Sequence, residues 1–484
     1  MANSELNIIK NVFISADANK LRLAEIYFNN SISEIKFTSE SIDWEEIDTT
    51  EKKNLFVKKH LLNRETAQNT INGEFNLLIP GGVDSHVHFN TPGFEDREDF
   101  QHASTAAAFG GVTTVIDMPC TSLPPVTSVK NLEEKLNALN NKSVIDFALW
   151  GGVSRNDIES KTNVKEQIQE LSKAGVAGFK AYLISGMQTF KDLNIEQMKI
   201  IAQFVATTGK PLGVHAEDKF LVESRRLTLQ EANRNGWRQY CLARDVLAEE
   251  KAVKEMIKIS KATGVKTHIV HLSSKLGLDL ISEAQKNNIS VTSETCPHYL
   301  YFTQDDFLND EISNFLKTAP PVKFEEDKAA LWKGLADGTL GFVVTDHAGS
   351  IPERDKTSEN FWDVYGGIPG VEHRVPFLFS EGFKKNRLSL EQTINLLSTN
   401  SADFFKLKKK GRIYNGFDAD FALIDLWSSE TISASNMHSK GKYTPFVGVE
   451  FNATVEKTWL RGNVVADRKN KTEIKFNGTF VTVN

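Results

Sequence analysis

Short apolar runs alternate with longer stretches of helical spacing through the middle of the chain. This pattern is typical of βα units around a parallel sheet. The apolar runs occupy residues 83–89, 112–118, 144–150, 176–182, 211–216, 266–272, 289–295 and 341–347. Eight units predict an α/β fold, a closed (β/α)8 TIM-like barrel, and a span of roughly 325 residues fits such a barrel with insertions. An open doubly wound sheet is the alternative.

The two ends of the chain carry a different pattern, in which short strand-like runs are separated by Gly and Asn turns. These runs are residues 7–14, 21–28, 32–37, 411–426, 453–466 and 472–484. We expect the ends to form one small β domain, from residues 1–78 and 408–484, around a barrel at 79–407. A charged stretch at 43–72 is interpreted as an insertion, and Lys408, Lys409 and Lys410 as a solvated helix end.

Composition narrows the range of functions that the chain could have. Hydrophobic residues make up 40% and charged residues 25% of 484 residues, as in a globular protein with a full core. A net charge of −6 argues against nucleic acid or an anionic membrane as partner. No apolar run reaches membrane-spanning length, and residues 1–11 lack signal-peptide features. We therefore expect a cytoplasmic protein with a small-molecule substrate. Three cysteines without CxxC spacing predict neither a disulfide framework nor a zinc knuckle.

Residue types that bind metals stand near the ends of several predicted strands. His86 and His88 are two residues apart, so a strand would project both imidazoles to one side as half of a metal site. Surface histidines on a sheet edge are the alternative. Barrel chemistry sits at the carboxyl ends of the strands, so we expect one mouth to gather further candidates: Lys180, His215, His271 and Asp346.

Lys180 is the unusual member, because a cation is unfavourable where metal ions gather. The set becomes consistent if the amine has added CO2, since the resulting carbamate is anionic and can bridge two metal ions. A lysine salt-bridged within the barrel is the alternative. A two-metal centre with these ligands keeps a positive charge, so it would lower the pKa of bound water and polarise a carbonyl. Asp346 could carry the proton to a leaving nitrogen. The predicted chemistry is hydrolysis of an unreactive amide.

Nine segments in fixed order resemble a known family. They are HVHFNTPG (86–93), GGVTTVIDMP (110–119), GVAGFKAYL (175–183), VHAED (214–218), HIVHLSS (268–274), ETCPHYLYFT (294–303), KTAPPVK (317–323), VVTDHAG (343–349) and KGRIYNGFDADFALID (410–425). Together they are similar to the cyclic-amide branch of the amidohydrolase superfamily, over about residues 77–462. That branch holds allantoinases, dihydroorotases, and dihydropyrimidinases or hydantoinases.

The resemblance implies a barrel with a β-sandwich composed of both termini, and ring-opening hydrolysis at two zinc ions bridged by carboxylated Lys180. In the family pattern one metal would be bound by His86, His88 and Asp346, and the second by His215 and His271. A homo-oligomer, tetramer or dimer, is also implied.

The branch members differ at a few positions. Dihydroorotases usually carry Arg two residues after the HxH pair, where this chain has Asn90, and the hydantoinase tyrosine position is Ser185. ETCPHYL followed by KTAPPVK looks most like allantoinase, whereas residues 367–382 resemble hydantoinases. We expect an allantoinase-like enzyme acting on a five-membered cyclic ureide, with dihydroorotase and dihydropyrimidinase or hydantoinase as alternatives.

A non-enzymatic scaffold is a further alternative, because some relatives have lost their metal ligands. All six ligand positions are filled here. The residues expected to contact substrate are Asn90, Thr121, His298 and the backbone near Ala319. Thr121 stands where family members usually have Asn, and a hydroxyl cannot make the two-sided contact of an amide.

Overall fold

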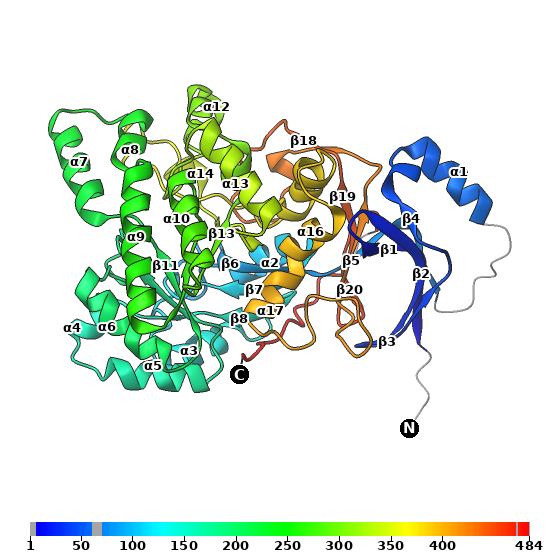
Figure 1. The fold of residues 1–484 in the computed structure, drawn as a ribbon, viewed down its shortest axis with the longest axis horizontal. Helices are drawn as coiled ribbons and strands as arrows, with labels where there is room; N and C mark the ends of the chain where they lie inside the picture. The colour runs from blue at the N-terminus through cyan, green and yellow to red at the C-terminus, as the bar shows by residue number, and fades with distance from the viewer. Residues whose placement is uncertain (1–5, 61–69, 471–472, 484) are drawn as a thin grey trace.

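The barrel wall is built from short parallel strands in the middle of the chain. The structure is a computed structural model that describes residues 6–60, 70–470 and 473–483. The wall consists of β6 (Gly82–His88), β7 (Val112–Asp117), β8 (Asp146–Leu149), β9 (Gly151–Gly152), β10 (Phe179–Tyr182), β11 (Pro211–His215), β12 (Lys266–Ile269), β13 (Val291–Thr295), β14 (Phe342–Val343) and β15 (His347–Ala348). They lie together on one side of the molecule in Figure 1.

The wall consists of two sheets, which meet to close the ring where two of the predicted strands are each split between them. One sheet has the order β14-β13-β12-β11-β10-β9 and the other β15-β6-β7-β8. Only Trp150 separates β8 from β9, so the third run passes from one sheet into the other, and the eighth run does the same between β14 and β15. The barrel prediction is confirmed. The expectation of one continuous strand over 341–347 is wrong, because the backbone turns at Asp346, where φ is 50°.

Helices cover the outside of the wall. The larger ones are α2 (Phe100–Phe109), α3 (Val129–Leu139), α5 (Val164–Lys173), α6 (Ile195–Ala206), α9 (Val246–Thr263), α10 (Lys275–Lys286) and α13 (Glu325–Asp337). Several begin at a side chain that accepts a main-chain N–H of the first turn, such as Ser128, Asp245 and Ser274. α7 (Lys219–Glu231) and α8 (Trp237–Ala243) follow β11 as an inserted helical pair. None of the helices in the described ranges is long and apolar enough to cross a bilayer.

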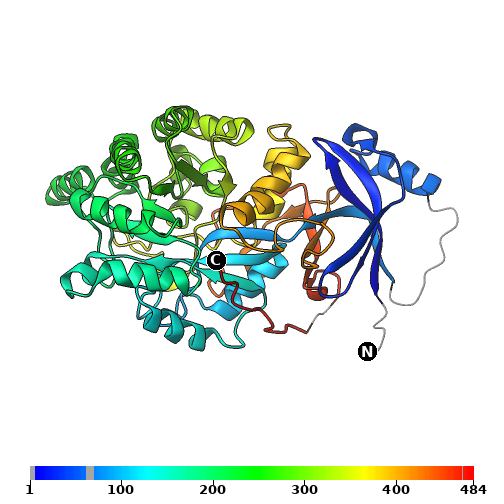
Figure 2. The same cartoon turned by 60° about the horizontal axis from the view of Figure 1, so that its bottom comes forward.

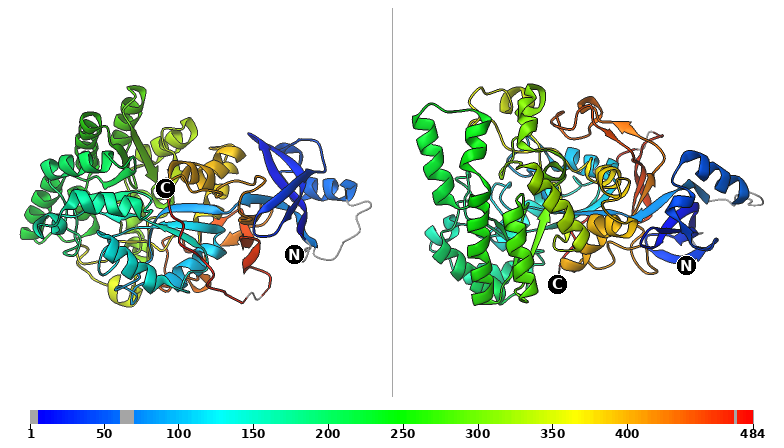
Figure 3. Two further views of the ribbon diagram at one scale, coloured as in Figure 1. Left: turned by 90° about the horizontal axis from the view of Figure 1, so that it is seen from below. Right: turned by 45° about the horizontal axis from the view of Figure 1, so that its top comes forward.

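The two ends of the chain share a sheet beside the barrel (Figures 2 and 3). Its order is β20-β19-β16-β5-β1-β2-β3, with β4 on β2. The strands are β1 (Asn7–Asp17), β2 (Lys20–Phe28), β3 (Ile32–Phe37), β4 (Ile42–Asp43), β5 (Thr70–Pro80), β16 (Phe421–Asp425), β19 (Thr454–Leu460) and β20 (Asn463–Asp467). β16 pairs with β5 in antiparallel register, Phe421 opposite Pro80, which joins the two ends directly.

Two details differ from the expectations for the ends. The predicted insertion contains a helix, α1 (Thr50–His60), and its residues 61–69 lie outside the described ranges. Residues 479–483 do not add a strand to the terminal sheet. They hydrogen-bond to the barrel, where the main chain of Phe147 donates to Thr479 and accepts from Val481. The boundaries at 78/79 and 407/408 stay predictions.

The expectation of a solvated lysine cluster is wrong for Lys410, which is buried. Its side chain is 3% exposed, and its Nζ lies 2.7 Å from both Asp146 and Asp420 and 2.9 Å from Asp418. Asp146 belongs to β8, whereas Asp420 immediately precedes β16. The ammonium therefore joins the barrel to the terminal sheet. The neighbouring Lys408 and Lys409 are exposed, as predicted.

Replacing Lys410 with methionine should destabilise the fold, because three carboxylates would be left without their shared cation. Breaking a buried ion pair in this way costs about 3–5 kcal/mol. Urea denaturation followed by circular dichroism measures the loss. Lys408→Met is the matched control, with an expected change of at most about 0.5 kcal/mol. Equal stability of the two variants would contradict the assigned role of Lys410.

Candidate metal centre and active site

The predicted ligands meet at the carboxyl ends of the barrel strands. His86 and His88 lie at the carboxyl end of strand β6, Lys180 lies in β10 and His215 ends β11. His271 follows β12, and Asp346 lies between β14 and β15; both have left-handed backbones, with φ of 41° and 50°. All of them except Lys180 line a cavity of about 900 Å3. The strand ends thus bring together the side chains that the sequence singled out.

Three of these side chains form a compact donor group. The Nε2 atoms of His86 and His88 lie 3.2 and 3.1 Å from the same oxygen, Oδ1 of Asp346. One ligand atom from each falls within 4.8 Å of the others, as a single metal ion requires. Burial alone would raise the pKa of Asp346, but the two imidazoles hold it well below its usual range. The group is a candidate metal site.

The remaining three side chains lie next to this group. The Nδ1 of His215 and the Nε2 of His271 are 3.0 Å apart. Burial lowers the pKa of both imidazoles, so each is in the neutral form that donates a lone pair to a metal. Lys180 is fully buried, its Nζ has no hydrogen-bond partner, and burial lowers its pKa to about 8.

Two buried glutamates behind the histidines were missed by the sequence analysis. Glu294 in β13 contacts Nδ1 of His86 and lies 2.9 Å from Nε2 of His268. Burial alone would raise the pKa of Glu294, but these histidines hold it well below its usual range. Carboxylates in this position fix the tautomer and orientation of a metal-binding imidazole. A glutamate inside the apolar run 289–295 was the available signal.

Glu217 supports the imidazole of His215 in the same way as Glu294 supports that of His86. Its Oε2 lies 2.8 Å from Nε2 of His215 and also contacts Nη1 of Arg244. Burial alone would raise the pKa of Glu217, but Arg244 and His215 lower it to about 2. The imidazole therefore presents Nδ1 to the site. The spacing of Glu217, two residues after His215, was the sequence signal.

The residues predicted to contact substrate differ in whether they line the cavity and in whether they already have a partner. Asn90 lines the cavity, and its buried Nδ2 has no hydrogen-bond partner. Ala319 also lines the cavity. Thr121 lines it too, but its Oγ1 lies 3.2 Å from Nδ1 of His88, so the hydroxyl contacts a candidate ligand. His298 is buried with its Nε2 unpartnered, outside the cavity lining formed by the described residues, and burial lowers its pKa to about 4.

The donor set fits the implied two-metal group. The neutral imidazoles of His215 and His271 line the same cavity as His86, His88 and the low-pKa carboxylate of Asp346, and the Lys180 amine is buried without a hydrogen-bond partner. A buried amine without a hydrogen bond is costly unless something else contacts it. Nitrogen and oxygen donors of this kind suit zinc.

Comparison with known proteins agrees with this geometry. Residues 77–465 match the model of the amidohydrolase family. Among curated proteins, an allantoinase of Enterococcus faecalis is 35% identical over 417 residues, covering 84% of this chain and 89% of its own. An allantoinase of Streptomyces avermitilis is 37% identical over 396 residues, covering 81% and 85%.

Solved structures are similar along the whole chain. The L-hydantoinase (dihydropyrimidinase) from Arthrobacter aurescens has a TM-score of 0.87 and 28% identity, covering 99% of this chain and 100% of its own. A D-hydantoinase has a TM-score of 0.85 and 25% identity, with 99% of each chain covered. The barrel with a terminal β-sandwich is therefore confirmed.

The chain belongs to the amidohydrolase family. Within that family it is a hydrolase that acts on cyclic amides, as predicted.

Glu294→Gln should weaken metal binding. An amide has one acceptor oxygen, so it cannot accept from both His86 and His268. Loss of such an outer partner typically lowers metal affinity about 10–100-fold, which competition with a chelator would measure. Glu283→Gln, on an exposed face of α10, is the control. Unchanged zinc affinity in Glu294→Gln would refute the supporting role.

Proposed function

We propose that this protein is an allantoinase-like enzyme, which opens the ring of a five-membered cyclic ureide such as allantoin to give allantoate. The observation that carries the proposal is the set of six ligand-type side chains, five of which line a cavity whose Arg and Lys side chains already have partners. Similarity to allantoinases of 35% and 37% identity supports the choice within the branch.

The charge of the cavity favours a neutral substrate. Each Arg or Lys in the cavity lining has a partner within the described part of the chain. Arg97 pairs with Asp355 at 3.2 Å, Arg226 with Glu223, and Arg244 with Glu217. Lys317 donates to the carbonyl oxygens of Phe361, Trp362 and Val364.

A substrate carboxylate would therefore find no free cation on these walls, and burying it unpaired is costly. This disfavours dihydroorotate, whose carboxylate needs such a partner. Allantoin and hydantoin rings are uncharged and need only hydrogen bonds. Asn90 Nδ2, which is buried and unpartnered at the cavity surface, offers one donor.

We propose that two zinc ions bind here, one to His86, His88 and Asp346 and the other to His215 and His271, with carboxylated Lys180 contacting both. Such ions would supply Lewis acidity for the ring carbonyl and acidify a water molecule between them. The burial of Lys180 without a hydrogen-bond partner supports its modification.

Asp346 is the proposed proton carrier. Its carboxylate accepts a proton from the water that attacks the ring carbonyl carbon. It then delivers that proton to the ring nitrogen as the carbon–nitrogen bond breaks. The new carboxylic acid loses the second proton of the water to solvent, which leaves a carboxylate and an open ureide. Asn90, Thr121, His298 and the backbone at Ala319 are the proposed substrate contacts. Because Thr121 contacts His88, we propose equally that Thr121 acts indirectly, by positioning that imidazole.

Hydantoinase or dihydropyrimidinase activity is the second candidate, and the full-length structural similarity favours it. Two observations weaken it. Ser185, at the position of the hydantoinase tyrosine, donates to the carbonyl of Phe190 at 2.8 Å. Tyr182 lines the cavity, but its OH lies 3.1 Å from Sγ of Cys120. A metal-free scaffold is disfavoured because all six ligand types are present.

We also propose a homo-oligomer, a dimer or tetramer, and a cytoplasmic location. Large exposed apolar side chains on α7, α8 and α9 support assembly: Phe220, Leu227, Leu242 and Leu247. Cys120, Cys241 and Cys296 are free and buried, which suits a reducing compartment.

The substrate assignment is tested by comparing kcat/KM for allantoin, hydantoin, dihydrouracil and dihydroorotate with protein expressed in zinc and bicarbonate. Allantoin should lead by at least about tenfold, which corresponds to about 1.4 kcal/mol of transition-state preference. Dihydroorotate should be the poorest because of the compensated walls. A lead by hydantoin or dihydrouracil would reject the ureide assignment.

Lys180→Ala should lose bound metal and activity, because it removes the proposed bridging carbamate. Short carboxylic acids such as acetate or propionate should restore part of both by occupying the space of the lost side chain. Zinc content and turnover are measured with and without the added acid, and wild-type protein with the acid is the control. Full activity in Lys180→Ala without rescue would exclude the bridge.

A further inference from the structure

The backbone of Asp346 is strained. Its φ of 50° lies in the left-handed region, which costs a residue with a side chain free energy that its surroundings must offset. It occupies the break between β14 and β15, so no ladder hydrogen bond of its own strand fixes it. The position of its carboxylate must therefore depend on the residues at either side.

The preceding residue is anchored by a buried carboxylate. Thr345 donates through Oγ1 to Oδ2 of Asp84 at 2.6 Å, and its main-chain N–H donates to Oδ1 at 3.2 Å. Asp84 is fully buried in β6, and Arg374 lies 3.9 Å from it. This side of Asp346 is thus tied to the strand that carries His86 and His88.

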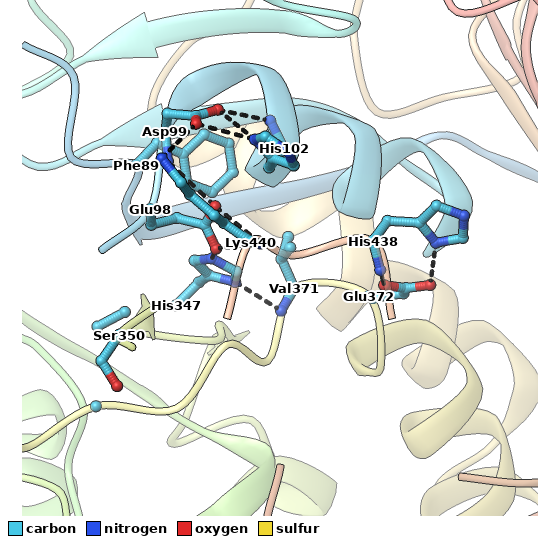
Figure 4. Close-up of polar contacts among 12 residues, drawn as sticks. Phe89, Glu98, Asp99, His102, His347, Ser350, Val371, Glu372, His438 and Lys440 are labelled. Carbon is cyan, nitrogen blue, oxygen red and sulfur yellow. Dashed lines mark hydrogen bonds and ion pairs between the residues drawn. The ribbon is translucent and has the colours of Figure 1, made fainter. Parts of the chain in front are cut away.

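The following residue, His347, is fully buried and faces a second carboxylate (Figure 4). The main-chain N–H of Val371 donates to Nδ1 of His347 at 3.3 Å. Nδ1 is then the acceptor, so the ring proton of the neutral imidazole lies on Nε2. The Oε2 of Glu98 lies 3.4 Å from Nε2, so the carboxylate faces this nitrogen at ion-pair distance without forming a hydrogen bond.

His347 is also registered against the metal-binding strand. In β15 it pairs with Val87, the residue between His86 and His88. Its ring packs edge-on against Phe89, with centroids 5.3 Å apart. A shift of His347 would therefore move Asp346 relative to both histidines.

We infer that Glu98, acting through His347, is a positioning residue that holds Asp346 where it can bind metal and carry the proton. Thr345 and Asp84 hold the other side, so the strained residue is clamped between two buried carboxylates. The inference rests on the proposed role of Asp346. Neither Glu98 nor His347 contacts the cavity, so both act only through the backbone.

The test is Glu98→Gln. Glu98 also accepts the main-chain N–H of Lys440, at 3.2 and 3.3 Å from its two oxygens. Glutamine removes the negative charge that faces Nε2 of His347, and it leaves one acceptor oxygen for the main-chain N–H groups of Lys440 and Asp99. We expect kcat to fall about 10–100-fold, KM to change less than about twofold, and zinc to be lost more readily to a chelator. An unchanged kcat and zinc affinity would overturn the inference.

Glu372→Gln is the matched control. Glu372 accepts from Nδ1 and the main-chain N–H of His438, at 2.7 and 2.9 Å, so it secures the same segment of chain as Glu98 does (Figure 4). Its side chain contacts neither His347 nor Asp346. It should leave kcat and zinc retention unchanged. A loss in Glu372→Gln equal to that in Glu98→Gln would assign the effect to residues 438–440 and reject positioning.

Two variants of His347 test whether the effect depends on the Nε2 position of the ring, which faces Glu98. Gln places an N–H near the position of Nε2 and should retain part of the activity, whereas Asn reaches only the Nδ1 position and should behave like Glu98→Gln. Equal activity of the two would contradict the role of Glu98. Zinc retention needs no substrate, so it remains informative if the wild type opens hydantoin but not allantoin, an outcome that rejects only the substrate assignment.

Discussion

The active end of this barrel depends on keeping polar ligands out of water while fixing where each one points. Imidazoles, a carboxylate and an amine are costly to bury unless they are paired. Here buried carboxylates stand behind the ligands: Glu294 behind His86 and Glu217 behind His215. They leave one ring nitrogen of each imidazole directed at the centre. The strand ends gather the ligands, and the glutamates orient them.

Much of this arrangement could be predicted from local patterns. Period-two spacing placed His86 and His88 on one side of a strand, and eight apolar runs predicted the barrel. The contacts of Glu294 could not be predicted, because they join residues far apart in the sequence through tertiary packing. The same reason explains Lys410, whose partners Asp146 and Asp420 lie in different parts of the fold. The turn at Asp346 depends on pairing with β6, which an apolar run does not reveal.

The cavity wall offers no unpaired cation to a substrate among the described residues. The inserted pair α7 and α8 brings Arg226 and Arg244 to the cavity, but each arrives with its own glutamate. Because these cations are already paired, a charged substrate would find no partner there, whereas donors such as Asn90 stay available to the uncharged ring that we propose as substrate. The carboxylate that pairs with Arg244 is also the one that contacts His215, so the wall of the cavity and the candidate metal centre share one residue.

The pairing of β5 with β16 has a consequence for how the chain folds during synthesis. Residues 70–80 leave the ribosome early, but their antiparallel partner at 421–425 follows only after all the barrel strands. The terminal sheet therefore cannot be completed until the barrel has been made, and one edge of β5 stays open during that interval. Because unpaired strand edges promote aggregation, this is the stage at which a nascent chain would benefit most from a chaperone.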